Sequence, residues 1–72
     1  MKKVSEIRIN TAYITLGQLL KITDWVQSGG EAKIMVKQLD IDVNGEKEDR
    51  RGRKLYPGDQ IRIQDKRYTI TE

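Results

Sequence analysis

The chain has 72 residues, enough for one small domain of marginal stability, so a deep enclosed active site is not expected. It contains no cysteine and no histidine, which excludes disulfides, thiolate sites, imidazole metal ligands and the commonest general base. Fourteen Lys and Arg against eleven Asp and Glu give a net charge of +3, so the positions of the cations matter more than their number.

The first predicted elements are a strand and a short helix. Apolar and polar residues alternate over residues 5–10, the pattern of a half-buried strand. Thr15 and Gln18 form a capping box, so a helix begins at Thr15, and the leucines of residues 16–20 line its buried side. Gly17 costs this helix about 1 kcal/mol relative to alanine. A tight connection over residues 24–27 then carries Trp25, which we expect to cover a small core.

A second helix is predicted from a similar start. The Ser28 side chain can accept a hydrogen bond from the amide of Glu31, while the Glu31 side chain can reach back to the amide of Ser28. An apolar stripe follows at the i, i+3, i+4, i+7 spacing of one helix face, formed by Ala32, Met35, Val36 and Leu39. Lys33 and Lys37 fall on a different face together with Gly30.

The remaining chain predicts short strands joined by tight turns. Alternation over residues 41–43, followed by Asn44-Gly45, indicates a hairpin whose second strand is residues 46–48. A charged loop at 49–54 and a type II turn at Pro57-Gly58 follow. Two more strands, at 61–63 and 68–70, are separated by a turn at 64–66.

These elements predict an α+β fold in which two or three short helices pack on a small, mostly antiparallel sheet. We expect the first and last strands to pair with each other or with the hairpin strands and so close the sheet. A single domain is expected over residues 1–72. No apolar run is long enough to span a membrane and no signal segment opens the chain, so we expect a cytoplasmic protein.

Four of these segments, in this order, resemble the core of the S-four RNA-binding domain, a module named after small-subunit ribosomal protein four. The matching pieces are Leu16 to Leu20, Ser28 to Ala32, Ile41 to Gly45, and Pro57-Gly58-Asp59 followed by Gln60-Ile61-Arg62-Ile63. The family-like core spans about 14–63, and the chain is most similar to the small stand-alone bacterial members called YaaA-like. The resemblance implies a helix-turn-strand core that binds RNA.

Two groups of residues are candidates for the RNA contact. The resemblance implicates the start and one face of the second helix, where free amides and a partial positive charge favour phosphate: Ser28, Gly29, Gly30, Lys33 and Lys37. Local charge alone adds four cations in five residues: Arg50, Arg51, Arg53 and Lys54. We expect the two groups to lie side by side and to form one electropositive surface.

The chain departs from the family pattern at two positions. Gly29 stands where the family usually has an arginine, which removes an expected phosphate contact. Leu39 stands where a glycine commonly ends the second helix. Asp40 and Asp42 place negative charge close to the proposed surface and are not expected to contact RNA.

Metal binding and catalysis have little support in the sequence. Asp40-x-Asp42-x-Asn44-Gly45 copies the first half of a calcium loop, but Arg51 stands where the loop needs a bidentate glutamate. Glu48 and Asp49 are expected in an exposed strand and loop, with nothing to raise a pKa. We therefore expect no metal, no cofactor and no enzymatic activity.

The predicted function is a non-catalytic module that binds structured RNA, ribosomal or transfer RNA, through phosphates and shape. The partner can be naked RNA or a ribosomal particle, no membrane is involved, and a monomer is favoured. The alternative is a small protein-interaction adaptor with a β-grasp-like sheet. A flexible terminal Gly-Gly, needed by sulfur carriers of that fold, is missing, because the sequence ends Thr71-Glu72.

Overall fold

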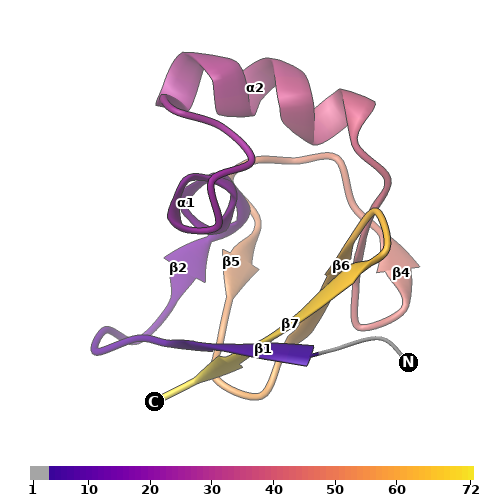
Figure 1. The fold of residues 1–72 in the computed structure, drawn as a ribbon. Coiled ribbons are helices and arrows are strands. Elements are labelled where there is room, and N and C mark those ends of the chain that lie inside the picture. The colour runs from indigo at the N-terminus through magenta and orange to yellow at the C-terminus, as the bar shows by residue number, and fades with distance from the viewer. Residues whose placement is uncertain (1–3) are drawn as a thin grey trace.

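Two short helices lie on one side of a five-stranded sheet in the computed structural model, which describes residues 4–72 (Figure 1). In chain order the elements are β1 (Val4–Arg8), β2 (Ile14–Thr15), α1 (Leu16–Ile22), α2 (Gly29–Gln38), β3 (Ile41–Val43), β4 (Glu46–Lys47), β5 (Lys54–Leu55), β6 (Gln60–Ile63) and β7 (Lys66–Thr71). The predicted α+β class is confirmed. Within residues 4–72, neither helix has the length and apolar character needed to cross a membrane.

The larger sheet has the strand order β1-β7-β6-β3-β4. β1 runs parallel to β7, and the other three pairs are antiparallel, as a mostly antiparallel sheet requires. The first and last strands thus pair with each other. The second sheet, β2 paired antiparallel with β5, was not predicted, because two-residue strands are too short to show an alternating pattern.

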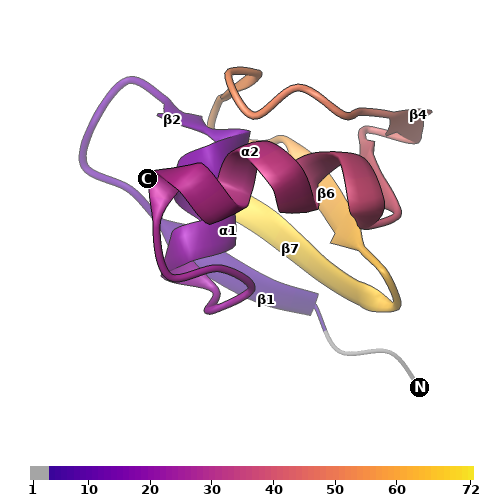
Figure 2. The ribbon, with the colours of Figure 1, turned by 90° about the horizontal axis from the view of Figure 1, so that it is seen from above.

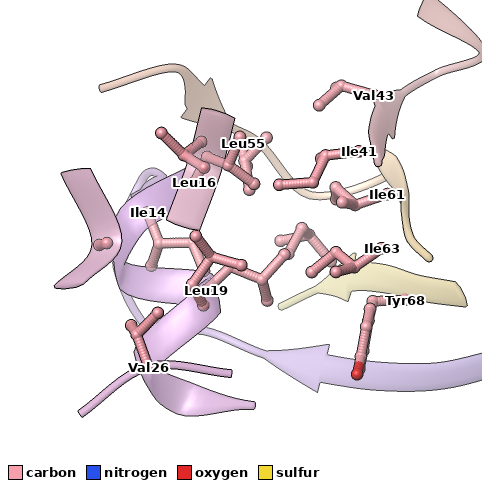
Figure 3. Close-up of a cluster of buried hydrophobic side chains, with 14 of the residues drawn as sticks. Ile14, Leu16, Leu19, Val26, Ile41, Val43, Leu55, Ile61, Ile63 and Tyr68 are labelled. Atoms are coloured by element: carbon pink, nitrogen blue, oxygen red, sulfur yellow. The ribbon is translucent and has the colours of Figure 1, made fainter. Parts of the chain in front are cut away.

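The core fills the space between the helices and the inner face of the larger sheet (Figure 3). Alternation along β3 and β6 turns every second side chain inward, so Ile41, Val43, Ile61 and Ile63 are buried. They meet the fully buried leucines of α1, at positions 16, 19 and 20. Trp25 is partly buried against this core, and its Nε1 donates a hydrogen bond to the Tyr68 hydroxyl at 3.2 Å.

The starts of both helices agree with the predictions from the sequence, except for one hydrogen bond. Both arms of the Thr15–Gln18 capping box are present. The Ser28 Oγ accepts from the amide of Glu31 at 3.3 Å, as predicted, but the predicted return bond is wrong. The chain enters α2 extended at Ser28, and the Glu31 carboxylate accepts instead from the amide of Gln27, at 3.0 Å.

The turns explain how so short a chain reverses direction repeatedly. Asn44 and Gly45 both have positive φ, 53° and 87°, as a two-residue hairpin turn requires. Gly58 has φ 97°, and the amide of Asp59 donates to the carbonyl of Tyr56 at 2.9 Å, which confirms the type II turn. α2 ends differently: Leu39 is extended, so no glycine is needed there.

Candidate nucleic-acid interface

The segment of residues 48–53, called here the arginine loop, folds around one buried carboxylate. Glu48 is only 5% exposed, which corrects the expectation of an exposed position. Its carboxylate accepts hydrogen bonds from the amides of Asp49 and Arg50 and from the guanidinium groups of Arg50 and Arg53, at 2.8–3.1 Å. These donors, the Arg50 guanidinium foremost, outweigh burial and lower the pKa of Glu48 from 4.5 to about 2.

Backbone bonds hold the arginine loop against the start of α1. The amides of Leu16 and Gly17 have no partner inside the helix, and they donate to the carbonyls of Arg53 and Arg51 at 2.9 and 2.8 Å. A Cβ on Gly17 would lie 3.3 Å from the Arg51 carbonyl oxygen and 3.4 Å from the Arg51 Cβ. The glycine that costs helix propensity therefore permits the loop to approach closely.

The same loop reaches the start of α2. The Arg51 guanidinium donates to the Gly29 carbonyl oxygen at 3.2 Å. A cation therefore lies beside the first turn of α2, although residue 29 carries no side chain. The amides of Gly29 and Gly30 precede the first intrahelical bond, from Ala32 to Ser28, and are left for solvent or a ligand.

Lys33 and Lys37 are exposed on α2, in a row that begins at Gly29. Each turn of a helix takes 3.6 residues, so Lys33 follows Gly29 on the same side and Lys37 continues that row. Seen from above, the segment after β4 runs alongside α2 (Figure 2). Both lysines are exposed, and neither forms an ion pair within residues 4–72. That the two cationic groups form one surface stays a prediction, supported by the bond between Arg51 and Gly29 at the start of the same helix.

The four clustered cations differ in how far their side chains are engaged by contacts within the protein. Arg50 and Arg53 share Glu48, although the Arg50 side chain remains 72% exposed and that of Arg53 35% exposed. Arg51 contacts only a carbonyl, among the bonds seen in the described residues. Lys54 leaves the loop as the first residue of β5 and lies over the Tyr13 ring.

A shallow hollow of about 310 Å³ lies between the two helix starts and the arginine loop. Its polar and glycine lining comes from Thr15, Gly17, Gln18, Lys21, Gly29, Arg51 and Gly52. No carboxylate takes part in the lining, as far as residues 4–72 are concerned. Sequence reasoning missed Lys21; its i, i+3 spacing from Gln18, which places both on one face of α1, was the available indication.

The two aspartates near the hairpin are engaged elsewhere. Arg62 on β6 binds the Asp42 carboxylate at 2.6 Å and the Asp40 carboxylate at 3.2 Å. Hydrogen bonding to Arg62, followed by its positive charge, lowers the pKa of Asp40. Within residues 4–72 no three acidic side chains gather as metal ligands, and the first half of the calcium-like pattern is occupied by this arginine.

For brevity we call Ser28–Gly30, Lys33, Lys37, Lys21 and the arginine loop the cationic surface. Comparison with known proteins identifies the family of this chain. The model of the S4 domain matches residues 7–71. A Bacillus subtilis (strain 168) protein named probable ribosome maturation protein RlbA is 52% identical over 58 residues, which are 81% of this chain and 82% of that relative. The chain belongs to the S4 domain family.

Proposed function

We propose that this protein is a non-catalytic module that binds structured RNA, ribosomal or transfer RNA, in the cytoplasm through the cationic surface. One observation carries the proposal: the arginine loop is anchored between the starts of α1 and α2, with Arg51 bonded to Gly29. On this basis we infer that guanidinium groups, helix amides and the Lys33–Lys37 row act together as one RNA-binding surface.

The chemistry of this surface suits the RNA backbone. Phosphates accept hydrogen bonds from arginine and from free amides at a helix start. Double-stranded RNA is recognised mainly by shape, phosphates and 2′-hydroxyls, because its major groove is too deep and narrow to read. A compact cationic ridge with a shallow hollow meets that requirement without a deep pocket.

The name of the Bacillus subtilis relative, a probable ribosome maturation protein, supports a ribosomal target. Ribosomal RNA, free or within a maturing particle, is therefore our first choice of ligand, and transfer RNA our second. The experiment is a binding titration with fragments of ribosomal RNA, transfer RNA and duplex DNA of equal length, repeated at several salt concentrations.

If about five phosphates are contacted, affinity for the preferred RNA falls several hundredfold between about 50 and 200 mM salt. Arg51→Ala and Lys33→Ala each weaken binding of all RNAs and reduce the salt dependence. Binding that is insensitive to salt, or capture of proteins but no RNA from cells after nuclease treatment, would contradict the proposal and favour the adaptor alternative.

A further inference from the structure

Two exposed tyrosine side chains meet on the small sheet, outside the cationic surface. Tyr13 is 39% exposed and Tyr56 is 48% exposed. Their ring centroids are 5.7 Å apart and the ring planes are tilted by 49°. Of the three tyrosines, Tyr68 is the one that is buried.

The pairing of β2 with β5 creates this arrangement. Ile14 lies opposite Leu55 and both side chains are buried, so the next residues outward, Tyr13 and Tyr56, face each other on the opposite side. Their backbones are held on both strands. The Thr11 hydroxyl donates to the Tyr13 carbonyl at 2.9 Å, and the Tyr56 amide donates to the Asp59 carboxylate at 2.8 Å.

Lys54 completes the cluster. It lies opposite Thr15, on the same face as Tyr13, and its Nζ is 5.1 Å from the Tyr13 ring centroid. This is within the range of a cation–π contact. Lys54 therefore covers one face of Tyr13, and Tyr56 is left as the more open ring. A cross-strand aromatic pair also stabilises a short ladder, so a test must separate that role from ligand binding.

The cluster adjoins the cationic surface. Lys54 directly follows Arg53 of the arginine loop, and Tyr56 is two residues further along an extended chain, about 7 Å. Viewed from above, β2 lies on the same side of α2 as the arginine loop (Figure 2). An RNA strand whose phosphates lie on the loop would thus pass its next nucleotides over these rings.

We infer that Tyr56, flanked by Tyr13 and Lys54, stacks with an unpaired base of the bound RNA. Aromatic side chains stack on bases that are free of a duplex, and the stacking tolerates any base. The inference rests on the proposed function and narrows its ligand: the RNA has a junction, with a duplex on the cationic surface and a single strand on the tyrosine pair.

Three RNA probes test this inference: a blunt duplex, the same duplex with an oligouridine tail, and the same duplex with an abasic tail of equal length. The two tails carry equal phosphate charge. The wild type binds the uridine tail about 5- to 150-fold tighter than the abasic tail, the range of one stacked base. Tyr56→Ala removes this preference but leaves the blunt-duplex Kd unchanged, and Tyr56→Phe retains it.

Val4→Ala is the matched control, because Val4 is an exposed apolar residue on the edge strand β1, at 53%, outside the cationic surface. Its Kd values equal those of the wild type. If circular dichroism shows that Tyr56→Ala does not fold, Tyr56→Leu takes its place, and its preference for the uridine tail is compared with that of Tyr56→Phe. Equal affinity of the wild type for both tails, or an equal loss on all three probes in the variant, overturns the inference alone. Failure of the wild type to bind any probe overturns the proposed function as well.

Discussion

At the scale of single residues, Gly29 is the position where a substitution is most clearly expected to strengthen RNA binding. A Cβ there would meet nothing within 4 Å, so a side chain fits without displacing its neighbours. Gly29→Arg places a second guanidinium beside that of Arg51, at the start of α2. We expect a severalfold tighter RNA complex and a salt slope steeper by about one.

Gly29→Ala is the control for this gain, since it improves helix propensity without adding charge. The arginine itself has little net effect on folding. Its gain in propensity, up to about 1 kcal/mol, is opposed by a cation at the positive end of the helix. If both variants bind RNA equally well, Gly29 is not at the interface.

The Glu48 carboxylate predicts a specific dependence of stability on pH. Because its folded-state pKa of about 2 lies below the ordinary 4.5, its stabilisation is complete above pH 4.5 and is lost as the pH falls toward 2. Glu48→Gln is expected to lower the free energy of unfolding by about 1–3 kcal/mol at neutral pH. Urea unfolding from pH 2 to 7 measures both effects, and the variant curve is flatter below pH 4.5.

At the scale of elements, the arginine loop and α1 form one unit. The amides of Leu16 and Gly17 lie in a first helical turn, where exchange with solvent is ordinarily fast. Their bonds to the loop carbonyls predict measurable protection in the wild type. Gly17→Val places a Cβ 3.3 Å from the Arg51 carbonyl oxygen, too tight for the loop to keep its position. It is expected to remove the protection of Leu16 and to weaken RNA binding about as much as Arg51→Ala.

Hydrogen exchange followed by NMR measures this coupling, and protection within α2 serves as the internal standard. Gly30→Ala is the matched variant, because its Cβ would lie 3.8 Å from the Ser28 Oγ, an ordinary contact. Retained protection of Leu16 in Gly17→Val would show that the loop accommodates the side chain and that the two elements are independent.

The same elements mark what sequence could and could not predict. Short-range features were predictable: the capping box of Thr15–Gln18 and the turns at Asn44-Gly45 and Pro57-Gly58. Each depends on residues at most four apart, so a short stretch of sequence is enough to predict its conformation. The pairing of Tyr13 with Tyr56 depends on strands brought together by the whole fold. Burial of Glu48 likewise depends on the path of the chain after β4. In the sequence Glu48 stands among charged residues, a setting that predicts an exposed side chain.

At the scale of the whole molecule, the distribution of charge outweighs its total. Arg67 on β7 is exposed, and its alternation with the inward-facing Tyr68 places it on the outer face of the larger sheet. Arg51→Gln and Arg67→Gln each lower the net charge from +3 by one unit. We expect the first to weaken RNA binding about tenfold and the second by less than about twofold at the same salt concentration.

Titration of both variants with the preferred RNA checks this expectation. Similar losses in the two would mean that the protein attracts RNA by its overall field, and that the cationic surface has no special part. Either interpretation requires that both variants unfold as the wild type does. We expect this, because Arg51 and Arg67 are both exposed.

The parallel pairing of β1 with β7 has a consequence for how the protein is made. Arg8 donates to the carbonyl of Glu72, a residue 64 positions later, and within residues 4–72 β1 has no neighbouring strand other than β7. While the polypeptide is being synthesised, the amino-terminal strand must wait for the last part to emerge before it can join the sheet. The larger sheet is thus completed only once β7 has been synthesised, and removal of β7 would leave β1 without a partner and expose one edge of β6.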